Sequence, residues 1–167
     1  MGTSIGHIQQ STIPDSATNK RGVRTQFAAL CFRGKGSDTQ VLLVTSRTTR
    51  RWIVPKGWPM AGLTPVEAAE REAWEEAGVK GKIAAACLGI YSYTKLLEDE
   101  GDDLPCVVAL FPLKVDTVAS RFPERRQRQR KWFSPKKAAE RVDEPELAQL
   151  ILNFKPELYF GKSVLNH

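Results

Sequence analysis

The chain has 167 residues, a length that fits one domain of ordinary size rather than two. It is 41% hydrophobic and 26% charged, which are the proportions of a globular protein and not of a disordered one. Lys and Arg (25) exceed Asp and Glu (19), so the formal net charge is +6. The longest nearly apolar run, residues 83–90, is far shorter than the ~20 residues that a membrane helix needs. We therefore expect no membrane span.

The N-terminal sequence has no apolar core of the kind that a secretory signal needs, so we expect a cytoplasmic protein. Cys31, Cys87 and Cys106 are odd in number and widely spaced, which favours buried thiols over disulfides or a CxxC metal site. Both histidines, His7 and His167, fall in terminal segments. Without an internal imidazole, a Ser-His-Asp triad and an HExxH zinc site are excluded.

Residues 1–20 are rich in Ser, Thr, Gln and Gly and predict a flexible arm, followed by a domain at 21–160 and a tail at 161–167. Short runs of β-branched and apolar residues predict strands, the first two joined as a hairpin through the turn sequence GKGSD. The expected strands are residues 26–33, 40–46, 52–55, 82–97, 106–115 and 129–133.

The clearest helix is expected at residues 65–77. Thr64 can cap it, Pro65 suits the first helical position, Glu67 completes a capping box and Gly78 ends it. Further helices are expected after Ser134-Pro135 and after Pro145. The last helix carries an apolar stripe of Leu147, Leu150, Ile151 and Phe154. Strands and helices are thus mixed, which predicts an α/β (α+β) domain with helices packed on a mixed sheet.

Three carboxylates crowd one turn of the 65–77 helix. Glu72 and Glu76 are one turn apart and share a face, and Glu75 borders that face. Like charges at this spacing cost a few tenths of a kcal/mol per pair, so helix stability does not call for them. Carboxylates are the ligands that Mg²⁺ and Mn²⁺ prefer. The pattern therefore indicates either a solvated acidic face or a divalent-metal site.

The segment GWPMAGLTPVEAAEREAWEEAGV, residues 57–79, resembles the Nudix box. It departs from that motif at Leu63, where the family has Glu, and at Ala73, where a bulkier aliphatic residue is usual. The matching positions are Gly57, Arg71, Glu72, Glu75, Glu76, Gly78 and Val79.

By this resemblance the chain is identified as a member of the Nudix (MutT-like) superfamily. The resemblance implies an α/β/α sandwich and a pyrophosphohydrolase that uses Mg²⁺ or Mn²⁺ to cleave a phosphoanhydride bond. It also implies that Glu72, Glu75 and Glu76 hold the metal with the backbone carbonyl of Gly57. Arg71, spaced i,i+4 from Glu75, is expected to orient these catalytic carboxylates by ion pairing. The general base is left open between Glu75 and the loop acids Glu98, Asp99, Glu100, Asp102 and Asp103.

Basic residues cluster at 47–56 and again at 121–131, where five Arg, one Lys and one Glu give a net charge of +5. Such blocks are solvated faces, nucleic-acid contacts or, beside a metal site, a wall for polyphosphate. Residues 28–57 and 122–142 look like the flanks of the diphosphoinositol polyphosphate and diadenosine polyphosphate phosphohydrolase branch. By that analogy, the phosphate-contact candidates are Arg33, Ser46, Arg47, Arg51, Lys56, Arg130 and Lys131.

Two rival interpretations remain: a catalytically silent domain that binds RNA or a nucleotide, and an enzyme that removes pyrophosphate from RNA 5′ ends. The second ranks below a small-molecule polyphosphate substrate because no base-stacking pair can be named. Core or rim packing is expected for the tryptophans Trp52, Trp58, Trp74 and Trp132. We expect a monomer, with a homodimer as the alternative.

Overall fold

The computed structural model describes residues 10, 22–95 and 103–166. In this part of the chain, eight strands form one mixed sheet with the main order β3-β2-β1-β7-β5. β4 pairs with β1, β6 with β7 and β8 with β2. The strands are β1 (Arg24–Arg33), β2 (Gln40–Thr45), β3 (Trp52–Ile53), β4 (Lys56–Gly57), β5 (Val79–Ile83), β6 (Gly89–Lys95), β7 (Leu104–Val118) and β8 (Arg130–Phe133).

β1 lies at the centre of the sheet. It pairs antiparallel with β2, as the predicted hairpin requires, and parallel with β7 over nine residues from Arg24 to Phe32. Its side chains alternate between the two faces. Ala28, Leu30 and Phe32 enter one core, and the residues between them enter the other.

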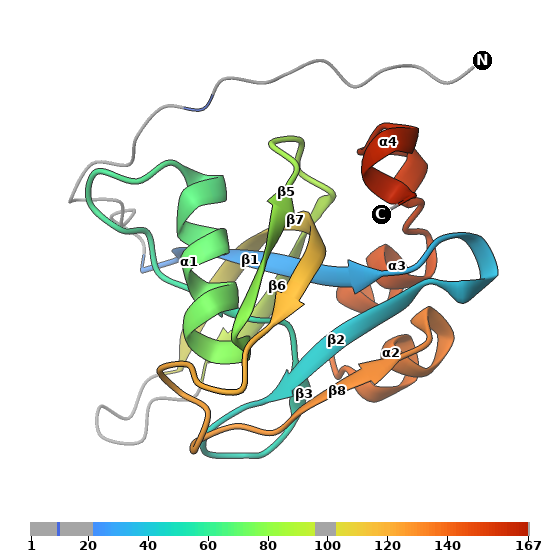
Figure 1. The fold of residues 1–167 in the computed structure, drawn as a ribbon. Helices are drawn as coiled ribbons and strands as arrows, with labels where there is room; N and C mark the ends of the chain where they lie inside the picture. The colour runs from blue at the N-terminus through green and yellow to red at the C-terminus, as the bar shows by residue number, and fades with distance from the viewer. Residues whose placement is uncertain (1–9, 11–21, 96–102, 167) are drawn as a thin grey trace.

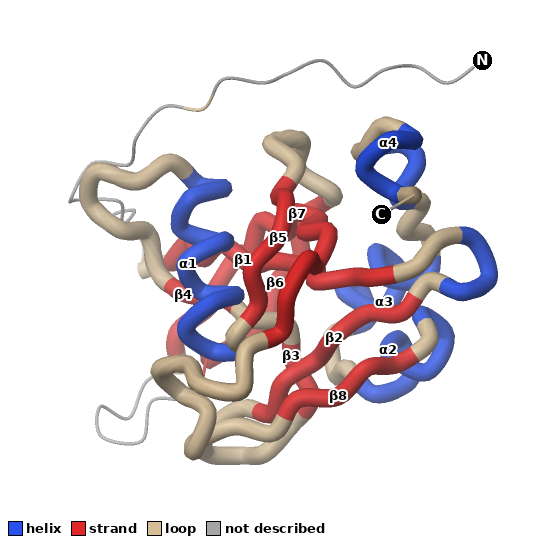
Figure 2. The backbone as a smooth tube through the Cα atoms, viewed as in Figure 1, coloured by secondary structure: helices blue, strands red, loops and turns tan. Residues whose placement is uncertain are grey.

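Helices cover both faces of this sheet, with α1 (Pro65–Ala77) on one side and α2 (Pro135–Arg141) and α3 (Pro145–Leu152) on the other (Figure 1). Figure 2 shows the strands as a layer between these helices. The core under α1 includes four helix alanines, and the opposite core includes Leu147 and Ile151 of α3. The expected α/β/α sandwich is confirmed.

α1 begins and ends where its sequence signals predict. The Glu67 amide donates to the Thr64 hydroxyl at 3.3 Å, and the Thr64 amide donates to the Glu67 carboxylate at 2.9 Å. Gly78 ends the helix in the left-handed region with φ 67°. This conformation is costly for residues with a side chain, which explains why the helix ends at glycine.

The single strand expected at 82–97 is wrong, because this segment forms two strands, β5 and β6, separated by residues 84–88. Both pair antiparallel with β7, which is longer than predicted. Pro112 of β7 faces the break and has no N–H to donate, while its carbonyl accepts from the amide of Ala84. The interruption places Cys87 in an exposed loop, so the expectation of a buried thiol is wrong there and holds for Cys31 and Cys106.

The C-terminal elements close the second core. Phe154 lies just beyond α3 but is still buried, with its ring 4.9 Å from that of Phe32. Residues in the expected tail form α4 (Lys162–Leu165), and Leu165 packs against this core. Gln10, in the expected arm, bonds to the Ala85 carbonyl and the Val66 amide. Among the described residues, no helix is long and apolar enough to span a membrane. His7 and His167 lie outside them.

Candidate active site

α1 turns two of its glutamates toward the sheet. Glu72 is 8% exposed and Glu76 is 6% exposed, and both share the buried face with Ala69 and Ala73. The alanines have short side chains, so the helix can lie close to the sheet and the two carboxylates enter the protein interior. Glu75 is half-buried and borders this face, as its position in the helix predicts.

The backbone of Gly57 lies directly against the Glu72 carboxylate. Gly57 is in β4, which pairs with β1 through Phe27. A Cβ atom at Gly57 would collide with the side-chain carboxylate of Glu72. The short strand thus brings main-chain atoms of the 56–57 segment next to an acidic side chain of the helix, and only glycine allows this approach.

Burial and mutual repulsion change the acidity of this pair. Burial, together with the negative charges of Glu76 and Glu75, raises the pKa of Glu72 to about 8. Burial also raises the pKa of Glu76, to about 7, although Arg128 and Lys56 act in the opposite direction. A nearby cation would favour the charged forms of both carboxylates.

Arg128 supplies part of the positive charge beside the α1 carboxylates. Its guanidinium lies 3.2 Å from Glu76 Oε1 and 3.2 Å from Glu124 Oε1, and it donates to the Thr45 carbonyl at 3.0 Å. The expected ion pair between Arg71 and the carboxylates is not formed among the described residues, because Arg71 lies on the exposed side of α1. Sequence reasoning missed Arg128 and Glu124; the one signal was that Glu124 is the single acid in residues 121–131.

The carboxylates of α1 and the main chain of Gly57 offer oxygen ligands that suit a hard divalent cation, but the described acidic side chains do not converge on one point. Within the described ranges, no three His, Cys, Asp or Glu side chains converge as metal ligands. Glu72, however, is buried and forms no hydrogen bond or ion pair with any described residue, while the main chain of Gly57 abuts it. A carboxylate in this environment is what a bound Mg²⁺ or Mn²⁺ would satisfy.

Two basic side chains, those of Lys56 and Lys95, lie against aromatic rings. The Lys56 ammonium lies 5.0 Å from the Tyr93 ring centroid, and the Lys95 ammonium lies 5.0 Å from that of Trp58. Burial raises the pKa of Cys106, while the charges of Lys95, Lys56 and Arg24 act against this increase. All three cations thus act on Cys106, and two of them, Arg24 and Lys95, were not among the predicted candidates.

Comparison with known proteins identifies the domain. The NUDIX domain profile matches residues 23–154. The chain belongs to the NUDIX domain family. It is 37% identical over 103 residues to Arabidopsis thaliana Nudix hydrolase 12, mitochondrial, covering 60% of this chain and 51% of the relative. It is also 38% identical over 98 residues to human diphosphoinositol polyphosphate phosphohydrolase 3-alpha, covering 50% and 59%. The chain thus spans about half the length of these relatives.

Solved structures share the NUDIX fold. The Caenorhabditis elegans Ap4A hydrolase has a TM-score of 0.55 at 22% identity, covering 78% of this chain and 94% of the other. A NUDIX hydrolase from Nitrosomonas europaea has a TM-score of 0.61 at 20% identity, covering 86% and 96%. At these identities the comparison supports the fold and nothing finer.

The NUDIX domain places the predicted phosphate-contact residues in different surroundings. Ser46, Arg47 and Arg51 lie in the β2–β3 loop, where Arg51 pairs with Asp143 at 3.1 Å. Arg33 lies at the far end of β1 from the Gly57 pairing, over the ring of Trp132. Arg130 donates to the Ala77 and Ala119 carbonyls, and Lys131 lies near the ring of Phe133. The structure therefore places Lys56 by the carboxylates and assigns Arg130 a structural contact.

Two other sets of predicted residues can be located. Asp103 is exposed, whereas Glu98, Asp99, Glu100 and Asp102 lie outside the described residues. Trp52 and Trp132 pack at the rim of the two cores as expected. Trp74 is half-buried with the Lys80 ammonium 4.7 Å from its ring centroid, and Trp58 is 39% exposed. The choice of general base between Glu75 and the loop acids therefore stays a prediction.

Proposed function

We propose that this NUDIX domain is a hydrolase that cleaves a phosphoanhydride bond with the help of Mg²⁺ or Mn²⁺. The observation that carries the proposal is the buried pair of Glu72 and Glu76, packed against the main chain of Gly57. Glu72, Glu76 and the Gly57 carbonyl would hold the cation, with Glu75 as a further carboxylate on the same turn. When bound, such a cation polarises a diphosphate and lowers the pKa of an attacking water.

The residues of the chain would then position the substrate. Lys56 contacts both Glu76 and Tyr93. Its amide donates to the Glu76 carboxylate at 3.2 Å, while its ammonium lies over the Tyr93 ring. Arg24, Lys56 and Lys95, whose charges all act on Cys106, would bind phosphates remote from the cleaved bond. The most favoured substrate is a diphosphoinositol polyphosphate or a diadenosine polyphosphate, in keeping with the names of relatives.

The proposed partner is thus a small polyphosphate, and we propose a cytoplasmic monomer. An RNA 5′ end is the second candidate substrate. The ring of Trp58 is the most exposed aromatic side chain in the described part of the chain, and Lys95 already stacks on it. A nucleotide base would have to displace this lysine in order to stack, which places RNA below a phosphate-rich small molecule.

The test is phosphoanhydride hydrolysis by the native chain and by Glu72→Gln, with Mg²⁺ or with EDTA. Glu72→Gln removes a buried carboxyl group that has no hydrogen-bond or ion-pair partner among the described residues, so the variant should fold at least as well as the native chain. We expect it to lose about 100-fold or more of the turnover. Glu70→Gln, on an exposed position of the same helix, is the matched control and should keep full turnover.

The substrate panel should contain a diphosphoinositol polyphosphate, a diadenosine polyphosphate, ADP-ribose and a 5′-triphosphorylated RNA at fixed Mg²⁺. The first two are expected to be turned over fastest. Turnover of none of them, together with salt-sensitive RNA binding, would instead favour a catalytically silent RNA-binding domain. Turnover that is the same with EDTA, or in Glu72→Gln, would contradict the metal-site proposal.

A further inference from the structure

The basic run at residues 121–131 separates into two kinds of side chain. Arg128 is buried on Glu76 and Glu124, and its side chain is 7% exposed. Arg130 donates to the Ala77 carbonyl at 2.6 Å and lies over the Phe122 ring. These two arginines attach the loop to the C-terminal end of α1. Arg121, Arg125 and Arg126 remain, and all three are exposed.

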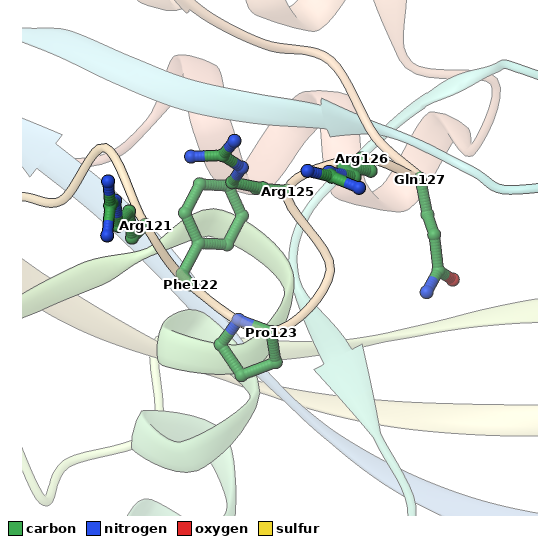
Figure 3. Close-up of a pocket in the computed structure, with 6 residues that line it drawn as sticks. All are labelled: Arg121, Phe122, Pro123, Arg125, Arg126 and Gln127. Atoms are coloured by element: carbon green, nitrogen blue, oxygen red, sulfur yellow. The ribbon is translucent and has the colours of Figure 1, made fainter.

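These three arginines line a surface pocket with a volume of about 600 Å³, together with Phe122, Pro123 and Gln127. Figure 3 shows the arginines spaced along one turn of the chain around Phe122 and Pro123. Within the described residues none of the three forms an ion pair, and their one side-chain hydrogen bond runs from Arg125 to the Ser120 carbonyl at 3.1 Å. Their positive charges are therefore not neutralised by the part of the protein that the structure describes.

The loop that forms this pocket is held in place by the helix. The Glu124 amide donates to the Glu75 carbonyl at 3.0 Å, and the Ala119 amide donates to the Gly78 carbonyl at 2.8 Å. The Phe122 ring lies against Gly78, where a Cβ atom would collide with it. A pocket whose backbone is already ordered loses little conformational entropy when a ligand binds.

We propose that Arg121, Arg125 and Arg126 form a binding site for the phosphate groups of a polyphosphate. Three uncompensated guanidinium groups around one pocket repel one another, so this arrangement does not contribute to stability. Guanidinium groups do match phosphate oxygens through paired, charge-assisted hydrogen bonds. Two more arginines adjoin the pocket, since Arg47 and Arg50 donate to the side chain and the carbonyl of Gln127 at 3.3 and 3.4 Å, although Arg47 also lies 3.7 Å from Glu124.

A polyphosphate fits this site better than a nucleic acid does. Proteins that bind single strands combine positive charge with free aromatic rings on which bases stack. The ring beside this pocket, Phe122, is already covered by the Arg130 guanidinium at 4.6 Å. The pocket also lies on the loop that carries Glu124 and Arg128 to the carboxylates of α1. The inference rests on the proposed function only for the assignment of these phosphates to a substrate.

The experiment is a calorimetric titration with tripolyphosphate in EDTA at about 150 mM salt, where weak long-range attraction is screened. It compares the native chain with the triple variant Arg121→Gln, Arg125→Gln, Arg126→Gln. The matched control is Lys136→Gln, Arg141→Gln, Lys155→Gln, which removes three exposed charges from other surfaces. We expect the loop variant to bind about tenfold or more weakly, and the control to bind within about twofold of the native chain.

Equal weakening in the two triple variants would overturn the proposal, because it would show a general charge effect. Tighter native-chain binding of an RNA oligonucleotide than of tripolyphosphate, lost in the loop variant, would also overturn it in favour of a nucleic-acid surface. Thermal melting checks that both variants fold. Since the titration uses neither metal nor turnover, its outcome is independent of whether the chain hydrolyses a phosphoanhydride.

Discussion

The Arg128 guanidinium and the Glu76 carboxylate form an ion pair at 3.2 Å, with both side chains only 7% exposed. This pair ties the loop before β8 to α1. Removal of one partner from a buried ion pair leaves an uncompensated charge. We therefore expect Arg128→Ala to lower the free energy of unfolding by about 3 kcal/mol or more, measured by urea denaturation in EDTA.

Two further variants test whether the uncompensated charge of Glu76 causes this loss of stability. Arg47→Ala removes a 61% exposed arginine that lies 3.7 Å from Glu124, and it should cost less than about 1 kcal/mol. Glu76→Gln combined with Arg128→Ala should recover part of the loss, because the orphaned charge is then absent. A cost for Arg128→Ala no larger than that for Arg47→Ala would contradict the predicted role of the buried pair.

The stability of the metal-free protein should fall as the pH rises. The pKa values of Glu72 and Glu76 are raised from 4.5 to about 8 and about 7 in the folded state. Between about pH 4.5 and 8 the folded state thus binds more protons than the unfolded state, so the free energy of unfolding decreases with pH. Melting in EDTA at pH 5.5 and 8.5 should show a loss on the order of 1–2 kcal/mol, after allowance for solvent screening.

The control for this pH dependence is Glu72→Gln. The difference between the native and variant profiles isolates Glu72 from other groups that titrate on folding, such as Lys56, whose pKa is lowered by burial. The exposed Glu67 has a lowered pKa, so its contribution is lost only at more acidic pH. Parallel native and variant profiles would mean that Glu72 has an ordinary pKa.

The reactivity of the thiols tests whether β5 and β6 are separated by an exposed loop. Cys87 is exposed, whereas Cys31 and Cys106 are buried, and burial raises the pKa of Cys31 to about 12. Since the thiolate is the reactive form, we expect one thiol per native chain to react rapidly with a disulfide reagent at pH 8. Cys87→Ser should abolish this rapid phase. A rapid phase that persists in the variant would contradict the placement of residues 84–88.

α1 could be predicted from sequence to the residue because its signals are local. Thr64, Pro65, Glu67 and Gly78 each act on backbone groups within one turn of themselves. The break between β5 and β6 depends instead on Pro112, which lies far along the chain in β7. The sequence of residues 84–88 does not by itself predict the break. Strand registers of this kind are decided by tertiary pairing.

The candidate site divides in the same way. The carboxylates of α1 were predictable because helical spacing places Glu72 and Glu76 on one face. Arg128 was not, since a run of five arginines gives no hint of which side chain turns inward. Its selection follows from the loop path and from the buried charge of Glu76. Arg33 was predicted as a phosphate contact, but its position at the end of β1 places it away from Gly57.

The contact between Gly57 and Glu72 gives the most direct test of how the site is assembled. In Gly57→Ala the new methyl group would collide with the Glu72 carboxylate, which is the end of a flexible side chain and can move aside. We therefore expect a change in Tm of a few degrees at most, because no backbone has to shift. The displaced carboxylate would no longer lie against the main chain, so kcat/KM for a diphosphate should fall about tenfold or more. Gly161→Ala is the matched control, since a Cβ atom there meets no atom within 4 Å. Equal kcat/KM in the two variants would show that this contact has no part in catalysis.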